Sequence, residues 1–281
     1  MTAARVGIAG GGTMGAGIAH RLLVNGIEVV LVERDDVEAA NARDRVAASL
    51  HRAHERGYLA DEVDVVLERL ITAGGIGAFD GLGFVIEAVP EQPDLKLDLL
   101  NRIEPLLADN AVLATNTSSL SIDGIATDLQ RPQRFCGMHF FNPVPASDLL
   151  EIVRGSATEA GTVAAAADLG ERLGLTTIEV GDAPGFATSR LGVALGLEAI
   201  RMVEDGVASA EDIDTAMRLG YRHPIGPLRL GDLVGLDVRL GIAEYLAAEL
   251  GPRFEPPQLL RDMVAAGTLG KKSGQGFFTW D

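Results

Sequence analysis

A histidine and a glutamate twelve residues apart are the strongest candidates in the sequence for acid–base chemistry. His139 follows one apolar run and Glu151 begins another, and Pro143 and Pro145 lie between them. Histidine is the side chain whose unperturbed pKa lies nearest neutrality, so His139 could take a proton from a substrate. A carboxylate at hydrogen-bond distance would orient its ring and favour the imidazolium. By spacing alone, His139 could equally be a structural histidine.

Two polar segments follow apolar runs of the kind that form buried strands. They are residues 116–119, which read Asn-Thr-Ser-Ser, and residues 139–143, which read His-Phe-Phe-Asn-Pro. In an open parallel sheet, ligands bind outside the carboxyl ends of the strands. We therefore expect both segments, with Ser118 and His139, to face one ligand site.

A glycine-rich loop near the N-terminus predicts a dinucleotide site. Residues 10–15 read Gly-Gly-Gly-Thr-Met-Gly, follow the strand-like run 6–9 and open a helical pattern. Gly10 would permit the tight turn, Gly12 would let the backbone approach a pyrophosphate, and Gly15 would let helix and strand pack closely. The pyrophosphate would lie on the helix N-terminus, where backbone N–H groups are available. The expected cofactor contacts in this loop are Gly10, Gly12, Thr13, Met14 and Gly15.

The expected cofactor is NAD, because Glu33 stands at the end of the next strand-like run. A carboxylate there accepts hydrogen bonds from the adenosine ribose and repels a 2′-phosphate, which favours NAD over NADP. Arg34 beside it could accommodate that phosphate, which is the argument for NADP. A structural glycine turn with a solvated Glu33 is the remaining alternative.

The order of elements predicts an α/β fold for residues 1–183. Short apolar runs alternate with longer helical patterns, which is typical of right-handed crossovers and of a Rossmann-type doubly wound sheet. The expected strands are residues 6–9, 29–32, 84–89, 112–115, 135–138, 151–153 and 176–180, and the expected helices are residues 13–25, 37–56, 63–70, 95–107 and 163–173.

The pattern becomes helical throughout after Pro184, which predicts a second, all-helical domain. Ser209 followed by Asp212 is typical of a helix N-cap. We expect a cofactor-binding domain over residues 1–183, carrying the catalytic histidine, and a domain for substrate binding and dimerisation over residues 184–281. The expected helices are residues 186–204, 209–219, 231–250 and 258–266. A homodimer is expected because one small domain would not bury the apolar face that includes Leu191, Ala194, Leu195 and Ala199.

The composition limits the classes of partner. Hydrophobic residues make up 47% of the chain and charged residues 23%, which is a globular composition. The net charge of −16 repels nucleic acid and anionic membranes, so we expect neither as a partner. The single cysteine, Cys136, excludes an internal disulfide and a thiolate metal cluster, and we expect no bound metal. Without a secretory signal pattern or a run of about 18 apolar residues, a cytoplasmic protein is expected.

Several signatures, in order and at matching spacing, resemble the L-3-hydroxyacyl-CoA dehydrogenase family over nearly the whole chain. They are residues 10–15 with 17–19, 86–89 with Glu91, 114–120, 137–145, 223–228, 231–237 and 270–277. The resemblance implies reversible NAD-dependent oxidation of a (3S)-3-hydroxyacyl-CoA, of the 3-hydroxybutyryl-CoA type. It also implies a homodimer that forms through the helical domain.

The resemblance further assigns roles to individual residues. His139 would abstract the 3-hydroxyl proton while a hydride passes to the nicotinamide, Glu151 would orient His139, and Ser118 would lie near the substrate hydroxyl. Ser49 and Arg56 match positions that contact CoA. The positions that match cofactor contacts are Glu91, Lys96, Asn142 and Lys272.

A basic window over residues 41–57 would supply the local positive charge that a chain of this net charge needs to bind CoA. Ser49, Arg52 and Arg56 fall on one face of the expected helix, and we expect them to contact the substrate. The alternative is a solvated helix face of mixed charge. The four arginines of the window are Arg43, Arg45, Arg52 and Arg56.

One substrate position departs from the family pattern. Residues 184–190 read Pro-Gly-Phe-Ala-Thr-Ser-Arg, whereas the family usually has asparagine where Ser189 stands. Because a hydroxyl is shorter than a carboxamide, we expect Ser189 to contact the substrate with an altered placement. Family members also tend to have lysine where Asp148 stands. The same chemistry on a carrier-protein-bound hydroxyacyl group or on a free hydroxy acid or sugar acid remains open, and so does a non-catalytic NAD-binding protein.

Overall fold

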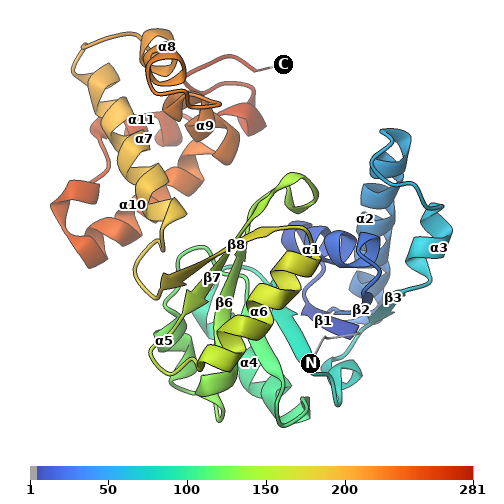
Figure 1. The fold of residues 1–281 in the computed structure, drawn as a ribbon. Coiled ribbons are helices and arrows are strands. Elements are labelled where there is room, and N and C mark those ends of the chain that lie inside the picture. The colour runs from blue at the N-terminus through green and yellow to red at the C-terminus, as the bar shows by residue number, and fades with distance from the viewer. Residues whose placement is uncertain (1–4, 281) are drawn as a thin grey trace. The chain divides into compact units, whose positions relative to one another are not determined.

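The computed structural model describes residues 5–280, and the chain divides into two compact units between Asp182 and Ala183. Figure 1 shows the first, unit 1, as a sheet with helices packed on it, and the second, unit 2, as a set of helices. Among the described residues, no helix combines the length and the apolar character needed to span a bilayer.

Unit 1 is built around an eight-stranded sheet with the order β3-β2-β1-β4-β5-β6-β7-β8. Neighbouring strands pair in parallel, except that β6 and β7 are antiparallel. From β1 the chain adds β2 and β3 on one side of the sheet and then β4 and β5 on the other side. Folds of this class bind their ligands at this switch point between β1 and β4. The strands are β1 (Arg5–Ala9), β2 (Glu28–Val32), β3 (Leu70–Ala73), β4 (Phe84–Glu87), β5 (Val112–Thr115), β6 (Phe135–Phe140), β7 (Leu149–Arg154) and β8 (Thr176–Gly181).

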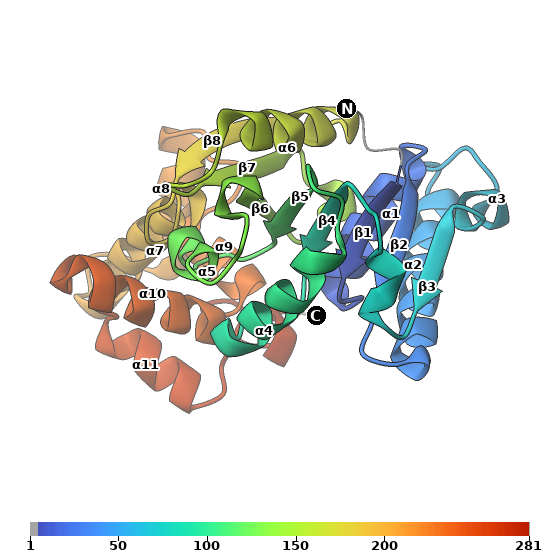
Figure 2. The ribbon, with the colours of Figure 1, turned by 90° about the horizontal axis from the view of Figure 1, so that it is seen from below.

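Helices cover both faces of this sheet, and Figure 2 shows α4 and α5 on the side away from α6. Every residue of β4, β5 and β6 is buried, as expected of strands covered on both faces. The sheet therefore holds its strand ends in fixed positions. The helices are α1 (Thr13–Val24), α2 (Asp36–Glu55), α3 (Val63–Leu67), α4 (Pro93–Ile103), α5 (Ile122–Ala126) and α6 (Ala160–Arg172), with 3-10 turns at Ile76–Phe79, Glu104–Leu106, Pro132–Arg134 and Val144–Ala146.

One feature of the sheet differs from the prediction, and another was not predicted. The helix predicted over residues 63–70 ends at Leu67, and Leu70 enters the sheet beside Val29 as the start of β3. Periodicity cannot separate a short apolar run in a helix from one in a buried strand. No direction was predicted for the strand over residues 151–153, and it pairs antiparallel to β6 as β7, because the loop over residues 141–148 is too short for the crossover that parallel neighbours need.

Unit 2 is helical, and its second helix begins as predicted, since the Ser209 hydroxyl accepts a hydrogen bond from Asp212 N at 3.1 Å. The helix predicted over residues 231–250 is in fact two helices, because Gly235 adopts φ 105° between them. Ala199 was predicted on an exposed face, but it is buried within the core of unit 2. The helices are α7 (Thr188–Glu204), α8 (Ala210–Gly220), α9 (Pro227–Val234), α10 (Leu236–Leu250) and α11 (Gln258–Ala265), with 3-10 turns at Pro252–Phe254 and Lys271–Ser273.

Candidate active site

The antiparallel pairing of β6 and β7 places His139 directly opposite Glu151. Side chains of paired residues in such a ladder lie on the same face of the sheet and within contact range. His139 Nδ1 lies 2.7 Å from Glu151 Oε2. The Glu151 side chain is wholly buried, whereas the His139 side chain is 10% exposed. The register of the sheet thus produces the pair that the sequence could only suggest.

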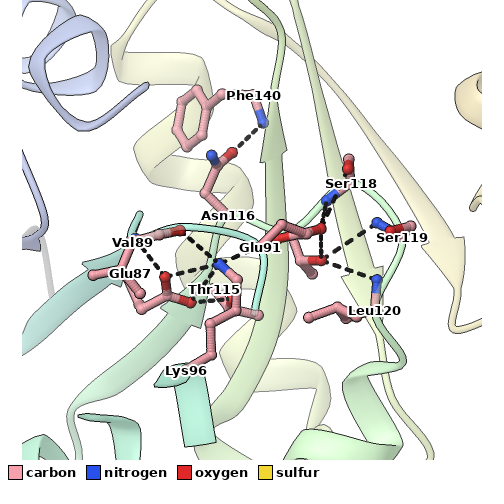
Figure 3. A network of polar contacts seen from close by, with 11 residues as sticks. Glu87, Val89, Glu91, Lys96, Thr115, Asn116, Ser118, Ser119, Leu120 and Phe140 are labelled. Carbon is pink, nitrogen blue, oxygen red and sulfur yellow. Dashed lines mark hydrogen bonds and ion pairs between the residues drawn. The ribbon is translucent and has the colours of Figure 1, made fainter. Parts of the chain in front are cut away.

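The turn after β5 carries Ser118 and is held by Glu91 (Figure 3). Glu91 Oε1 accepts hydrogen bonds from Thr117 Oγ1 at 2.5 Å, from Ser118 N at 2.9 Å and from Ser118 Oγ at 3.2 Å. Asn116 Oδ1 accepts a hydrogen bond from Phe140 N at 3.0 Å, which joins the ends of β5 and β6. The two polar segments singled out in the sequence therefore lie at adjacent strand ends.

A buried ion pair between β4 and α4 supports this turn (Figure 3). Lys96 Nζ lies 2.8 and 3.0 Å from the two carboxylate oxygens of Glu87, and both residues are wholly buried. Thr115 Oγ1 donates to Glu87 Oε2 at 2.5 Å. Burial raises the pKa of Glu87, although Lys96 acts in the opposite direction. The pair therefore depends on Lys96 to keep a buried carboxylate ionised.

Lys96 also connects this pair to the Ser118 turn. Its Nζ lies 3.3 Å from Glu91 Oε2 and donates to Val89 O at 3.2 Å. A direct contact between Lys96 and NAD, which the resemblance implies, would require this wholly buried side chain to move. The contact of Lys96 with NAD stays a prediction.

The glycine loop has the shape that a pyrophosphate requires. Gly10 adopts φ 98°, and a Cβ on Gly15 would overlap the carbonyl oxygen of Gly10. A Cβ on Gly12 would meet nothing within 4 Å, so this side of the loop is open. Gly12 is the N-cap of α1 and makes no side-chain cap, so the first N–H groups of the helix are available to a ligand. These features fit a bound dinucleotide, with Thr13 and Met14 in the first turn of the helix.

Gly11 is a further required glycine that the sequence motif did not identify. A Cβ there would overlap the side chain of Ala42 on α2. The N–H of Gly11 donates to Glu33 Oε1 at 2.7 Å, so the loop and the end of β2 are joined. The contact with Ala42 comes from a distant part of the chain, so the local pattern gives no signal for it. Glu33 lies beside the loop, as a ribose-binding carboxylate should.

Ser49, predicted to contact the substrate, is paired with a buried histidine. Its Oγ lies 2.9 Å from His20 Nδ1, and His20 is 4% exposed. Burial, with smaller effects of Arg21 and Arg52, lowers the pKa of His20 to about 4. The ring is therefore neutral near pH 7. His20 is therefore a buried, packed histidine.

The four arginines of the basic window divide into two groups. Arg43 Nη1 donates to Leu70 O at 2.9 Å, and Arg45 Nη1 donates to Gly11 O at 2.9 Å, so these two anchor other parts of the fold. Arg52 and Arg56 are exposed at the end of α2. Only Arg52 and Arg56 therefore present their charges on the helix face that is predicted to bind CoA.

Three further residues were predicted to contact cofactor or substrate. Asn142 is exposed on the loop after β6. Ser189 lies in the first turn of α7 in unit 2. Lys272, also in unit 2, donates from Nζ to Asp237 Oδ2 at 2.6 Å. The contacts of these residues with cofactor and substrate stay predictions.

Comparisons with known proteins agree over the whole chain. Residues 5–183 match the family model for the 3-hydroxyacyl-CoA dehydrogenase NAD binding domain, and residues 185–280 match that for the 3-hydroxyacyl-CoA dehydrogenase C-terminal domain. The chain is 41% identical over 280 residues to a 3-hydroxybutyryl-CoA dehydrogenase of Mycobacterium tuberculosis, which covers 98% of both chains. The structure is similar to that of (S)-3-hydroxybutyryl-CoA dehydrogenase from Ralstonia eutropha, with a TM-score of 0.94 at 40% identity over 100% of both chains. It is also similar to that of a diketoreductase that acts on dicarbonyl compounds, with a TM-score of 0.89 at 25% identity over 100% of both chains.

Proposed function

The chain belongs to the 3-hydroxyacyl-CoA dehydrogenase family, and on this premise we propose that it oxidises a short-chain (3S)-3-hydroxyacyl-CoA, such as 3-hydroxybutyryl-CoA, to the 3-ketoacyl-CoA. It is an NAD-dependent oxidoreductase. The observation that carries the proposal within the chain itself is the contact of 2.7 Å between His139 and Glu151, at the strand ends where this class of fold binds its ligands.

His139 is the proposed general base. Glu151 holds Nδ1 and fixes the orientation of the ring, so Nε2 is the nitrogen that takes the proton of the 3-hydroxyl group. The carboxylate then stabilises the imidazolium that results. When bound, NAD supplies the nicotinamide ring that accepts the hydride from the substrate. In the reverse reaction, His139 returns the proton as a general acid.

Ser118 is the proposed partner of the substrate oxygen. Its hydroxyl lies 3.2 Å from Glu91 Oε1, and we propose that its hydrogen turns to the substrate oxygen and stabilises the negative charge that develops there as His139 takes the proton. Glu91 Oε1 also accepts a hydrogen bond from Ser118 N at 2.9 Å, which keeps Ser118 in place. Glu91 is therefore a positioning residue for Ser118, and Lys96 holds Glu91 in turn. The proposed contacts of NAD are the glycine loop, Glu33, Glu91, Asn142 and Lys272.

Ser49, Arg52 and Arg56 are proposed to bind the CoA moiety. Reversing both arginines, with Arg52→Glu and Arg56→Glu together, should raise KM for acetoacetyl-CoA by about tenfold or more. The same change should leave KM for acetoacetyl-pantetheine, which lacks the nucleotide phosphates, nearly unchanged. Arg102→Glu, an exposed charge reversal on α4, serves as the control. Equal effects of the double variant on both thioesters would exclude this face.

A homodimer formed through unit 2, located in the cytoplasm, is also proposed. Leu191 on α7 is 71% exposed, and Leu195 on the same helix is also exposed. Apolar side chains of this size are commonly covered by a partner subunit. Light scattering of the purified protein checks the state in solution, and a monomeric mass would contradict the proposal.

A substrate panel tests the proposed function. The oxidation of NADH is followed with acetoacetyl-CoA, with longer 3-ketoacyl-CoA thioesters, with the matching carrier-protein thioester and with free keto acids. We expect the highest kcat/KM with acetoacetyl-CoA. A dicarbonyl compound without CoA is the second candidate substrate, favoured by Ser189 in place of asparagine and by the similarity to the diketoreductase. A higher kcat/KM for such a compound would replace the first proposal with the second.

A further inference from the structure

Two arginines lie beside the carboxylate that is expected to bind the adenosine ribose. Arg34 follows Glu33 directly, and its side chain is 76% exposed. Arg45 reaches the glycine loop from α2, and its Nη1 donates to Gly11 O at 2.9 Å. The N–H of the same Gly11 donates to Glu33 Oε1 at 2.7 Å. If Glu33 binds the ribose as expected, both guanidinium groups lie near the position of the additional phosphate of NADP.

Glu38 on α2 contacts both of these arginines. Its Oε1 accepts from Arg34 Nη2 at 3.3 Å, and its Oε2 accepts from Arg45 Nη2 at 3.4 Å. The Glu38 side chain is only 26% exposed. One carboxylate thus contacts two guanidinium groups, that of Arg34 in the loop before α2 and that of Arg45 on α2.

Asp35 fixes the position of Glu38 and adds to the same cluster. Its Oδ1 accepts a hydrogen bond from Glu38 N at 2.8 Å and so caps the start of α2. Its other oxygen accepts from Arg34 Nε at 3.2 Å. The Glu38 N–H, with a smaller contribution from Arg34, keeps the pKa of Asp35 below its ordinary value.

The charges in this cluster oppose a second phosphate. Three carboxylates (Glu33, Asp35 and Glu38) face two guanidinium groups (Arg34 and Arg45), so the local balance is negative. A 2′-phosphate carries a charge of about −2 and needs donors that are available to it. Here one terminal nitrogen of each arginine, Nη2, is directed to Glu38, and Nη1 of Arg45 is directed to Gly11 O.

We propose that Glu38 is a specificity-determining residue, which withholds Arg34 and Arg45 from a 2′-phosphate and so makes NAD the preferred cofactor. Glu33 repels the phosphate directly. Glu38 accepts hydrogen bonds from Arg34 and Arg45, the two side chains that could otherwise bind the phosphate. The presence of an arginine next to Glu33 is thereby compatible with a preference for NAD. This inference rests on the proposed NAD site of unit 1, but it does not depend on the substrate or on catalysis.

Calorimetric titration of the full-length protein with NADH and NADPH tests the proposal through Kd. Glu38→Gln keeps the size of the side chain and removes its charge. We expect it to lower Kd for NADPH by about tenfold, while Kd for NADH changes by less than about twofold. Glu33→Gln combined with Glu38→Gln should lower Kd for NADPH by about a hundredfold, since one change removes repulsion and the other releases donors.

Two further variants separate this mechanism from a general effect of net charge. Glu28→Gln removes one negative charge at the other end of β2, where Glu28 pairs with Arg5 at 2.7 Å, and should leave both Kd values unchanged. Arg34→Gln in the Glu38→Gln background should abolish most of the gain for NADPH. An unchanged Kd for NADPH in Glu38→Gln, or a gain equal to that in Glu28→Gln, would overturn the proposal.

The same titrations distinguish this inference from the proposed function. If the natural protein binds NADH and reduces acetoacetyl-CoA but Glu38→Gln does not gain affinity for NADPH, only the role of Glu38 is wrong. If the natural protein binds neither dinucleotide, the NAD site itself is wrong, and both proposals are rejected together.

Discussion

Two buried carboxylates of one sheet, Glu87 and Glu151, each hold a basic side chain, but the two pairs are built differently. Both oxygens of Glu87 contact Lys96, and Thr115 donates to one of them as well. Lys96 is wholly buried with its partner. Glu151 is also wholly buried, yet the side chain of His139 remains 10% exposed.

This difference separates a structural pair from a candidate catalytic pair. An ammonium group with no exposed surface cannot reach a ligand without a change in conformation, so we expect Lys96 to act mainly by holding Glu87 and Glu91. A partly exposed imidazole can exchange a proton with a bound ligand. Loss of the first pair should therefore affect mainly stability, whereas loss of the second should affect mainly turnover.

The largest effect on stability is expected from Lys96→Met, which leaves the Glu87 carboxylate buried without its cation. The free energy of unfolding should fall by about 3–5 kcal/mol, because an uncompensated buried charge is strongly destabilising. Urea denaturation at neutral pH measures this change. Glu87→Gln combined with Lys96→Met should recover part of the loss. If the free energy of unfolding of Lys96→Met lies within about 1 kcal/mol of that of the natural protein, Lys96 does not have this structural role.

The next effect is expected from Glu151→Gln, which keeps the size of the side chain and removes its charge. The kcat for acetoacetyl-CoA reduction should fall by about a hundredfold or more, since an amide does not stabilise the imidazolium. The free energy of unfolding should change less than it does in Lys96→Met. Steady-state kinetics and urea denaturation of the same preparation provide both values. An unaltered kcat would mean that this pair, too, is only structural.

A smaller effect is expected for His20, a buried histidine whose partner is the hydroxyl of Ser49 and not a carboxylate. Its pKa is lowered from 6.5 to about 4, so the unfolded chain binds this proton more tightly. Stability should therefore fall as the pH drops through this window, by about 2 kcal/mol from this group between pH 7 and pH 5. His20→Gln should remove that part of the loss in urea denaturation at the two pH values. His51→Gln, at an exposed position, is the control, and an identical pH dependence in His20→Gln would contradict the expectation.

Sequence patterns predicted the features that depend on local order. The family, the α/β fold class with its helical second part, and NAD as cofactor are confirmed. Seven of the eight strands overlap predicted apolar runs, and β3 does not, because its first residue, Leu70, was assigned to the helical pattern over residues 63–70.

Contacts between distant elements could not be predicted in this way. The spacing of His139 and Glu151 suggested a pair only if their strands were neighbours, and the antiparallel register that joins them depends on the whole sheet. Arg34 and Glu38 are four residues apart at the start of a helix, where a contact is readable from sequence. The third member, Arg45, lies two turns after Glu38 on the same helix, and the contact that the sequence could not predict is that of Arg45 with Gly11 O.

The central claim is that His139 exchanges the substrate proton, and a His139→Gln variant tests it most directly. Its kcat for acetoacetyl-CoA reduction is measured together with its Kd for NADH. The assignment predicts that kcat falls by about a thousandfold, while NADH binds as in the natural protein. A folded variant that binds NADH and keeps kcat within about tenfold of the natural value would contradict it.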